Sequence, residues 1–295
     1  MPLIRRHDGD RVRGLAPMRR IMPFLMRRRN ESLVFQDTTY RAGALQDWLA
    51  RYNQHHAVHA TAFEVLIYAC AQALLARPEL NRFVSGGQIY QRRGVQVSFV
   101  VKRSMTDHGG VTTLKTPMPP GESFPDFVAR IAVLLHEART KDRAVDRETA
   151  WVVRLPAVLL RLLVALAMKL DAWNLYPRVM TENDPLYASL FLANLGSAGV
   201  SDAYHHLFEY GTVSIFGTMS ELRPTPFVDG DRVVVAPGIS VRFTFDERIH
   251  DGFYAARSLQ IARHLMEEPD TWLGPPEGAP RFALERAAAM VDARS

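Results

Sequence analysis

The stretch that decides the fold is residues 239–259, which read ISVRFTFDERIHDGFYAARSL. Its first seven residues alternate between apolar and polar, the period of a strand with one buried face. The apolar members are Ile239, Val241, Phe243 and Phe245. The charged sequence DERIHDG follows directly at Asp246–Gly252, and apolar residues then recur at helical spacing as far as Pro269. We therefore predict a strand, a charged loop and a helix, in that order.

The sequence before this stretch predicts more strands. Asp229-Gly230 is a strong turn signal and predicts a hairpin between Phe227-Val228 and Arg232–Ala236. Two earlier apolar runs, residues 186–192 and 212–218, are also typical of strands.

The first half of the chain mixes helices and strands. Thr61 and Glu64 have the spacing of a capping box, so a helix is expected from there to the residue before Pro78. Val95–Val101 predicts a strand, and Ser123 can cap a second helix. This alternation predicts an α/β fold.

Four segments, in this order, resemble the catalytic domain of the 2-oxo-acid dehydrogenase acyltransferases (E2) and chloramphenicol acetyltransferase. They are TAFEVLIYACAQALLARPELNRF (61–83), IYQRRGVQVSFVVK (89–102), LFLANLGSAGV (190–200) with the strand TVSIFGTMSE behind it, and residues 239–259. The second of them resembles a pair of strands in the family. The resemblance covers about residues 30–270. It implies the chloramphenicol acetyltransferase-like, CoA-dependent acyltransferase fold: a mixed sheet flanked by helices, assembled as trimers with the active site between subunits.

The resemblance also gives each residue of the charged loop a role. The family signature reads L-S-F-D-H-R-x-x-D-G; its histidine is the general base, and the aspartate four residues later fixes the loop through an ion pair. Here Glu247 occupies the histidine position and Asp251 the aspartate position. Asp246, Arg248 and Gly252 match the structural positions of the signature.

A second family motif, S-N-L-G, contains a serine that donates a hydrogen bond to the oxyanion of the reaction. In this chain Ala193 stands at the serine position, while Asn194 and Gly196 match the motif. Ser197, just beyond the turn, is a candidate replacement donor, and its alternative role is hydrogen bonding within the turn.

Both substitutions weaken the inherited chemistry. Proton transfer from a thiol of pKa about 8.5 costs about 2.7 kcal/mol to a histidine but about 5.7 kcal/mol to a glutamate at its ordinary pKa. Loss of an oxyanion donor costs about 2.7–4 kcal/mol more. Any transfer must therefore use Glu247, made more basic by burial, or the nearby His250 as its base. The structural alternatives are a salt bridge of Glu247 with Arg248 or with an arginine of a neighbouring chain, and a surface or loop-packing role for His250.

The chain is expected to divide into three parts. Residues 1–30 form a basic arm with nine arginines, residues 31–270 the acyltransferase-like domain, and residues 271–295 a C-terminal tail. An apolar helical insertion at about 140–182 has no counterpart in the family pattern. Its apolar stretch, residues 151–175, carries too many charges to span a membrane. It predicts either a buried helical hairpin or a helix packed on a partner or a membrane interface.

The expected ligands follow from the resemblance. Coenzyme A or acyl-CoA would be a substrate, with no covalently bound cofactor and no lipoyl domain. The basic arm could bind an anionic membrane or a neighbouring subunit, and no nucleic-acid motif accompanies it. A single cysteine, Cys70, in an apolar run excludes a disulfide framework, and we expect no metal site.

Three functions stay open on the sequence. The first is acyl transfer between coenzyme A and an unknown acceptor. The second is a catalytically inactive homologue that acts as a trimeric scaffold or an acyl-CoA or lipid binder. The third is a membrane-surface protein. With no signal-peptide pattern, a cytoplasmic or membrane-peripheral location is expected.

Overall fold

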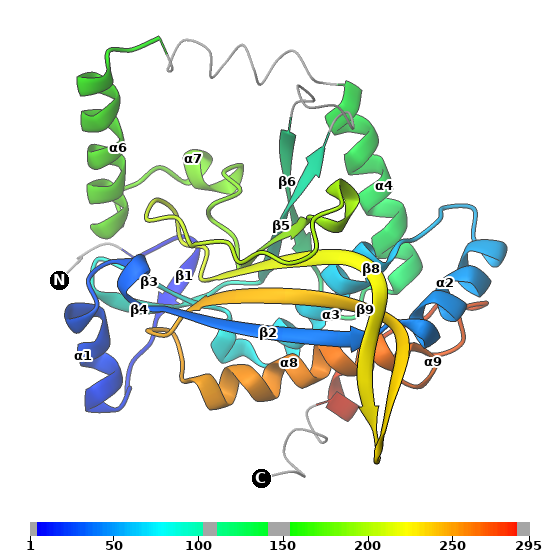
Figure 1. Ribbon diagram of the computed structural model, residues 1–295. Helices are drawn as coiled ribbons and strands as arrows, with labels where there is room; N and C mark the ends of the chain where they lie inside the picture. Colours follow the sequence, from blue (N-terminus) through cyan, green and yellow to red (C-terminus); the bar gives the residue numbers. More distant parts are fainter. Residues whose placement is uncertain (1–4, 103–110, 141–153, 288–295) are drawn as a thin grey trace.

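The computed structural model describes residues 5–102, 111–140 and 154–287. Its centre is a six-stranded mixed sheet of order β2-β9-β8-β7-β5-β6 (Figure 1). The strands are β2 (Leu33–Arg41), β5 (Val95–Lys102), β6 (Val111–Met118), β7 (Leu190–Asn194), β8 (Ile215–Asp229) and β9 (Arg232–Asp246). β7 pairs in parallel with β8 and β5, and the other pairs are antiparallel. The mixed α/β sheet predicted from the sequence is confirmed.

Helices cover one face of this sheet and form the main core with it. They are α2 (Gly43–His55), α3 (Ala62–Ala76), α4 (Phe124–Thr140) and α8 (Gly252–Glu267), with the short α9 (Pro269–Trp272) behind α8. The other face is covered by the irregular segment after β7, where Leu207 and Val213 pack on Phe191 and Phe216. Both faces of the central strands are therefore buried.

The deciding strand behaves as its alternation predicts. The apolar side chains of β9 all lie in the main core: Ile239, Val241, Phe243 and Phe245. On the opposite face Arg242 forms ion pairs with Asp37 at 3.1 Å and Asp202 at 3.2 Å. The predicted hairpin is also confirmed, with Phe227 opposite Val234 and Asp229 opposite Arg232. The tip of this hairpin extends beyond the sheet, at the lower right of Figure 1.

The helix starts are confirmed too. Thr61 precedes α3, and its amide donates to the Glu64 carboxylate at 2.6 Å, as a capping box requires. Ser123 precedes α4, and its hydroxyl accepts the Asp126 amide at 3.3 Å. Trp272, Leu273 and Phe282 pack on the main core, so the described part of the predicted tail, as far as residue 287, is folded onto the domain.

Cys70 lies on the buried side of α3, and burial raises the pKa of its thiol to about 12. The thiolate is the reactive form, so below that pH the native thiol is almost entirely protonated. We expect a thiol reagent at pH 8 to label the native protein only as fast as the protein unfolds, and to label it at once in denaturant. Fast labelling under native conditions would contradict the buried position.

The N-terminal segment differs from the predicted free arm. β1 (Gly9–Arg11) pairs with β4 (Gln88–Arg92), which pairs with β3 (Arg82–Ser85), and α1 (Pro17–Leu25) follows. Arg6 and Arg29 are buried, because acidic side chains and carbonyl oxygens of the domain compensate their charge. A cluster of arginines in a sequence predicts a solvent-exposed segment. The packing of residues 5–30 on the domain therefore could not be predicted from composition.

Three strand predictions need correction. Residues 89–102 do contain two strands, but β4 and β5 lie in different sheets and do not pair with each other. β7 begins at Leu190 rather than at residue 186, and β8 begins at Ile215 rather than at residue 212. The residues before them turn, and the amides of Thr212 and Val213 both donate to the Leu186 carbonyl.

The apolar insertion is not the buried hairpin that was one of its two interpretations. Within its described part, α6 (Ala157–Ala172) lies beside the body of the protein (Figure 1). The exposed apolar side chains of α6 include Val158, Leu162, Leu163, Val164 and Leu166. Asp171 anchors its end: Arg6 Nη2 donates to this carboxylate at 2.6 Å and Ser85 Oγ at 2.7 Å. α7 (Arg178–Glu182) follows. No helix within the described residues has the length and hydropathy to cross a membrane.

Candidate active site

The charged loop between β9 and α8 is built around a buried carboxylate. Asp246 is fully buried, and Arg248 donates to its two oxygens from Nε at 2.8 Å and from Nη2 at 2.7 Å. Ser32 Oγ adds a hydrogen bond at 3.0 Å, and Arg29 Nε lies 4.0 Å away. Bidentate pairing of this kind fixes both partners in one geometry. Asp246 and Arg248 thus form the fixed base of the loop.

Glu247 sits on this rigid base with its backbone held on both sides. Its amide donates to the Ser32 carbonyl at 2.9 Å, and its carbonyl accepts from Arg19 Nη1 at 2.7 Å. The Glu247 side chain is half-buried, and its carboxylate makes no hydrogen bond or ion pair with any residue that the structure describes. The salt bridge to Arg248 is not formed, because that guanidinium is committed to Asp246. The main chain is thus fixed while the carboxylate remains available.

Both ring nitrogens of His250 make hydrogen bonds. Nδ1 accepts the Asp251 amide at 2.9 Å, so the ring proton belongs on Nε2, which donates to the Glu79 carboxylate at 2.8 Å. The ring also packs on Tyr254, with 4.0 Å between centroids. Because neither ring nitrogen is free to accept a proton, the arrangement favours loop packing over a role as base.

Asp251 begins helix α8. Its carboxylate accepts the Tyr254 amide at 2.9 Å, and this hydrogen bond lowers the pKa of Asp251 below its ordinary value. Arg19 Nη2 of α1 lies 4.0 Å from the same carboxylate. Gly252 has open space around its Cα, and the single chain gives no steric reason for glycine there.

The turn after β7 is the second half of the expected site. Ala193 is buried and offers only a methyl group where the family has a donor. Asn194 Oδ1 accepts the Ser197 amide at 3.1 Å, and Ser197 Oγ donates to the Asn194 carbonyl at 2.9 Å. The serine hydroxyl is therefore used within the turn. The Asn194 amide nitrogen, by contrast, makes no hydrogen bond with the described residues.

Gly196 places this turn against β8. A Cβ atom at this position would overlap the Ser220 carbonyl and the Glu221 amide, which are backbone atoms and cannot move independently. We expect Gly196→Ala to lower the free energy of unfolding by about 1–3 kcal/mol, the usual cost of overpacking. Denaturant unfolding measures this effect.

Gly43→Ala is the matched control for that substitution. Gly43 lies in the first turn of α2, and a Cβ atom there would meet nothing within 4 Å. The control should be neutral or slightly stabilising, since alanine favours a helix. Equal effects of the two substitutions would contradict the close approach at Gly196.

The two halves of the site lie far apart within one chain. Ala193 is opposite Thr218 on β8, and Thr218 is opposite Arg242 on β9, four residues before Asp246. At about 3.4 Å per residue and about 4.8 Å per strand, the turn and the loop are about 14 Å apart along the strands and about 10 Å apart across them. A reacting atom must lie about 3 Å from both groups. One chain alone therefore does not assemble the two halves.

Three residues of the site were missed from the sequence: Arg19, Ser32 and Glu79. They hold Glu247, Asp246 and His250 respectively, and they come from segments far from the loop. Arg19 stood in the predicted arm and Glu79 in the turn after α3, where neither carries a local motif. No group of three or more metal-binding side chains occurs within the described ranges of the chain.

Comparisons with known proteins agree with this fold. Residues 178–274 match the family model described as 2-oxoacid dehydrogenases acyltransferase (catalytic domain). A probable dihydrolipoamide acetyltransferase from Listeria monocytogenes superposes with a TM-score of 0.57 at 15% identity, covering 88% of this chain and 97% of that one.

The chain has an E2-like acyltransferase fold. The dihydrolipoamide acetyltransferase of Azotobacter vinelandii gives a TM-score of 0.57 at 19% identity, with 87% and 92% coverage. A chloramphenicol acetyltransferase gives 0.54 at 10% identity, with 88% and 100% coverage. No curated protein matches the sequence. The E2-like fold thus spans nearly the whole domain of its structural relatives, while the identities are low enough that the likeness concerns the fold.

Proposed function

We propose that this E2-like protein transfers an acyl group between coenzyme A and a thiol or hydroxyl acceptor, with Glu247 as the general base. The observation that carries the proposal is the free Glu247 carboxylate on a main chain fixed from both sides. A positioned base needs a rigid backbone and an uncommitted side chain. His250, the other candidate, has neither ring nitrogen available.

The energetic deficit of a carboxylate base can be reduced at an interface. In the single chain the Glu247 side chain is half-buried and still reaches solvent. Contact with a second subunit and with substrate would remove water from it, which disfavours the charged form and makes the carboxylate a stronger base. This fits a site completed only by assembly.

We assign the oxyanion contact to Asn194 of a second copy. Its Oδ1 faces the Ser197 amide, so its amide nitrogen points away with two hydrogens to donate. A side-chain amide is a recognised oxyanion donor. The Asn194 turn lies beside the middle of β8, opposite Met219, whereas the Glu247 loop follows the end of β9. Because this separates them within one chain, each site would combine the turn of one subunit with the loop of another, as in a trimer.

The test measures release of coenzyme A from acetyl-CoA and longer acyl-CoA thioesters with a panel of thiols and alcohols. Asn194→Ala and Glu247→Gln subunits, each inactive alone, are then co-expressed with different tags. Random mixing would leave about a quarter of the sites with both native groups, and activity should return in proportion. Turnover by the native protein without such recovery would place the site in one chain. No turnover at all would sink the transferase proposal.

A second candidate is a catalytically silent homologue that serves as a trimeric scaffold or acyl-CoA binder. The buried methyl of Ala193 favours it, since no side chain at that position can donate to an oxyanion. Calorimetry with coenzyme A and acyl-CoA would separate a binder from a scaffold. Turnover that Glu247→Gln abolishes would rule this candidate out.

A third candidate, association with a membrane surface, is supported by the exposure of α6. Its apolar side chains Leu162 and Leu166 are 61% and 53% exposed, and its exposed charged residues, Arg161 and Lys169, are both basic. Helices of this composition lie in the interface of anionic bilayers. Flotation of the protein with anionic vesicles should be lost at high salt and with Leu162→Gln/Leu166→Gln. A protein that stays at the bottom of the gradient in all lipids would exclude this role and a peripheral location.

A further inference from the structure

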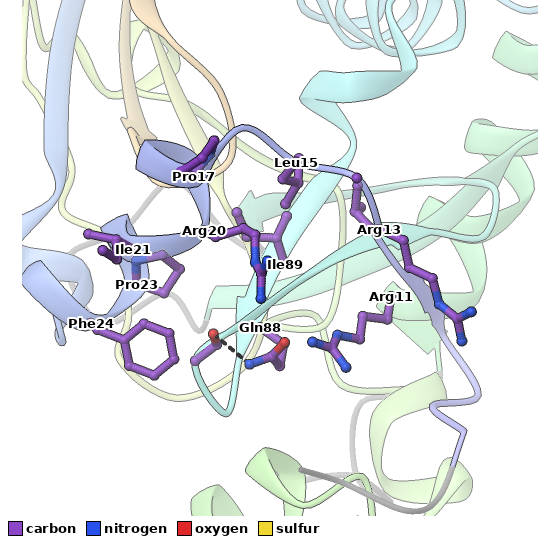
Figure 2. A pocket seen from close by; sticks show the side chains of 13 residues that line it. Arg11, Arg13, Leu15, Pro17, Arg20, Ile21, Pro23, Phe24, Gln88 and Ile89 are labelled. Carbon is purple, nitrogen blue, oxygen red and sulfur yellow. Dashed lines mark hydrogen bonds between the residues drawn. The ribbon is translucent and has the colours of Figure 1, made fainter.

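A hollow of about 690 Å³ lies between the N-terminal segment and the β3–β4 turn (Figure 2). Its wall residues Leu15 and Ile89 pack with Ile249 of the charged loop, so it adjoins that loop without including Glu247. Its walls come from the chain around β1, from α1 and from the start of β4. Three arginines line it: Arg11, Arg13 and Arg20. None of the residues proposed for acyl transfer lines it, and neither that reaction nor the fold accounts for its free arginines.

The charge in this hollow is not compensated. None of the three guanidinium groups makes a hydrogen bond or an ion pair with any described residue, and no aspartate or glutamate lines the hollow. Figure 2 shows Arg11 and Arg20 pointing toward Gln88, while Arg13 turns outward. This contrasts with Arg6 and Arg29 in the same segment, which are buried against acidic partners and carbonyl oxygens. Two converging free guanidiniums are a binding arrangement for phosphate.

The remaining wall is apolar. Leu15, Ile21, Phe24 and Ile89 line the hollow beside the arginines, and Ile21 and Phe24 are half-exposed or more. A hydrated inorganic anion gains nothing from such a wall. A molecule with an anionic head and a hydrocarbon chain would satisfy both surfaces.

The hollow also lies next to the exposed apolar helix. The Gly86-Gly87 turn is wedged between the two helices: a Cβ on Gly87 would touch the Phe24 ring of α1, and a Cβ on Gly86 would overlap the Ala172 carbonyl at the end of α6. α1 and α6 accordingly lie on the same side of the molecule (Figure 1). The exposed apolar residues of both helices therefore lie on the side of the molecule that holds the three free arginines.

We propose that this hollow binds the head of an anionic phospholipid, with its phosphate between Arg11 and Arg20 and the start of its acyl chain along Phe24 and Ile89. The proposal depends on the membrane-surface role only in that the protein must reach a bilayer. It does not depend on acyl transfer. A twofold contact with a second copy is disfavoured, because the same free guanidiniums would face each other across it.

Vesicle binding tests the site. The protein is sedimented with phosphatidylcholine vesicles and with vesicles that also contain phosphatidic acid. Arg11→Gln/Arg20→Gln should weaken binding to the anionic vesicles by about 10- to 30-fold, the loss expected for two basic residues at such a surface. The matched control is Arg232→Gln/Arg281→Gln, which removes the same net charge from two side chains that also lack described partners. Equal losses in the two variants, or no loss, would overturn the proposal.

A soluble probe separates the site from docking on a bilayer. Short-chain phosphatidic acid, kept below its micelle concentration, is titrated by calorimetry with inorganic phosphate as the comparison. Binding of the lipid that depends on Arg11 and Arg20, without vesicle binding, would keep the site and reject the membrane-surface role. Equal affinity for inorganic phosphate, or displacement of the lipid by acyl-CoA at equal concentration, would refute the lipid site.

Discussion

Glu247→Gln is expected to lower the release of coenzyme A by about 100- to 10,000-fold, the usual contribution of a positioned general base. The amide keeps the size of the side chain but has no proton affinity at neutral pH. Since the Glu247 side chain makes no contact in the described structure that stabilises the fold, the melting temperature should not change. Steady-state rates with the best acceptor, measured beside thermal unfolding, would show both results.

The matched control for Glu247→Gln is His250→Asn in the same loop. His250 holds Glu79 and packs on Tyr254, so its replacement should reduce stability while leaving the pH dependence of the rate in place. If His250→Asn removes the activity and Glu247→Gln does not, the roles assigned to these two residues are reversed.

Asp246→Asn is expected to lower the free energy of unfolding by about 3–5 kcal/mol, the cost of breaking a buried ion pair from one side. The substitution keeps the volume but removes the charge that Arg248 and Arg29 face. Both guanidiniums are almost fully buried, so they would remain as uncompensated cations. Urea unfolding with a tryptophan signal measures the change.

An exposed pair gives the reference value for this substitution. Glu182 and Arg178 pair at 2.6 Å on the surface of α7, and Glu182→Gln should cost less than about 0.5 kcal/mol. Similar losses for the buried and the exposed pair would contradict the electrostatic account of the loop.

The elements that the sequence predicted well are those with local signals. Alternation in β9, the Asp229-Gly230 turn and the capping box at Thr61 each depend on residues close in the chain. The N-terminal segment was misjudged because Arg6 is buried against Asp171 and Ser85. Both partners are more than 75 residues away from it in the sequence. Long-range compensation of charge leaves no local pattern.

The site shows the same limit. Glu247, Asp251 and the Asn194 turn were located from motif positions, and their backbone settings agree with structural roles in a loop and a turn. Which side chains are free could not be predicted, because it depends on residues such as Glu79, which comes from a distant segment and binds the His250 ring. The free state of Glu247 and the engaged state of His250 are properties of the fold.

The bond between Arg6 and Asp171 has a practical consequence for handling the protein. A start site or protease cut that removes the first eight residues would leave the Asp171 carboxylate with Ser85 as its remaining described side-chain partner. The end of α6 would lose its ion pair with the Arg6 guanidinium, and the exposed apolar helix could then bind to other molecules. Affinity tags therefore belong at the C-terminus, and an N-terminally trimmed preparation is expected to aggregate at concentrations where the full chain stays dispersed.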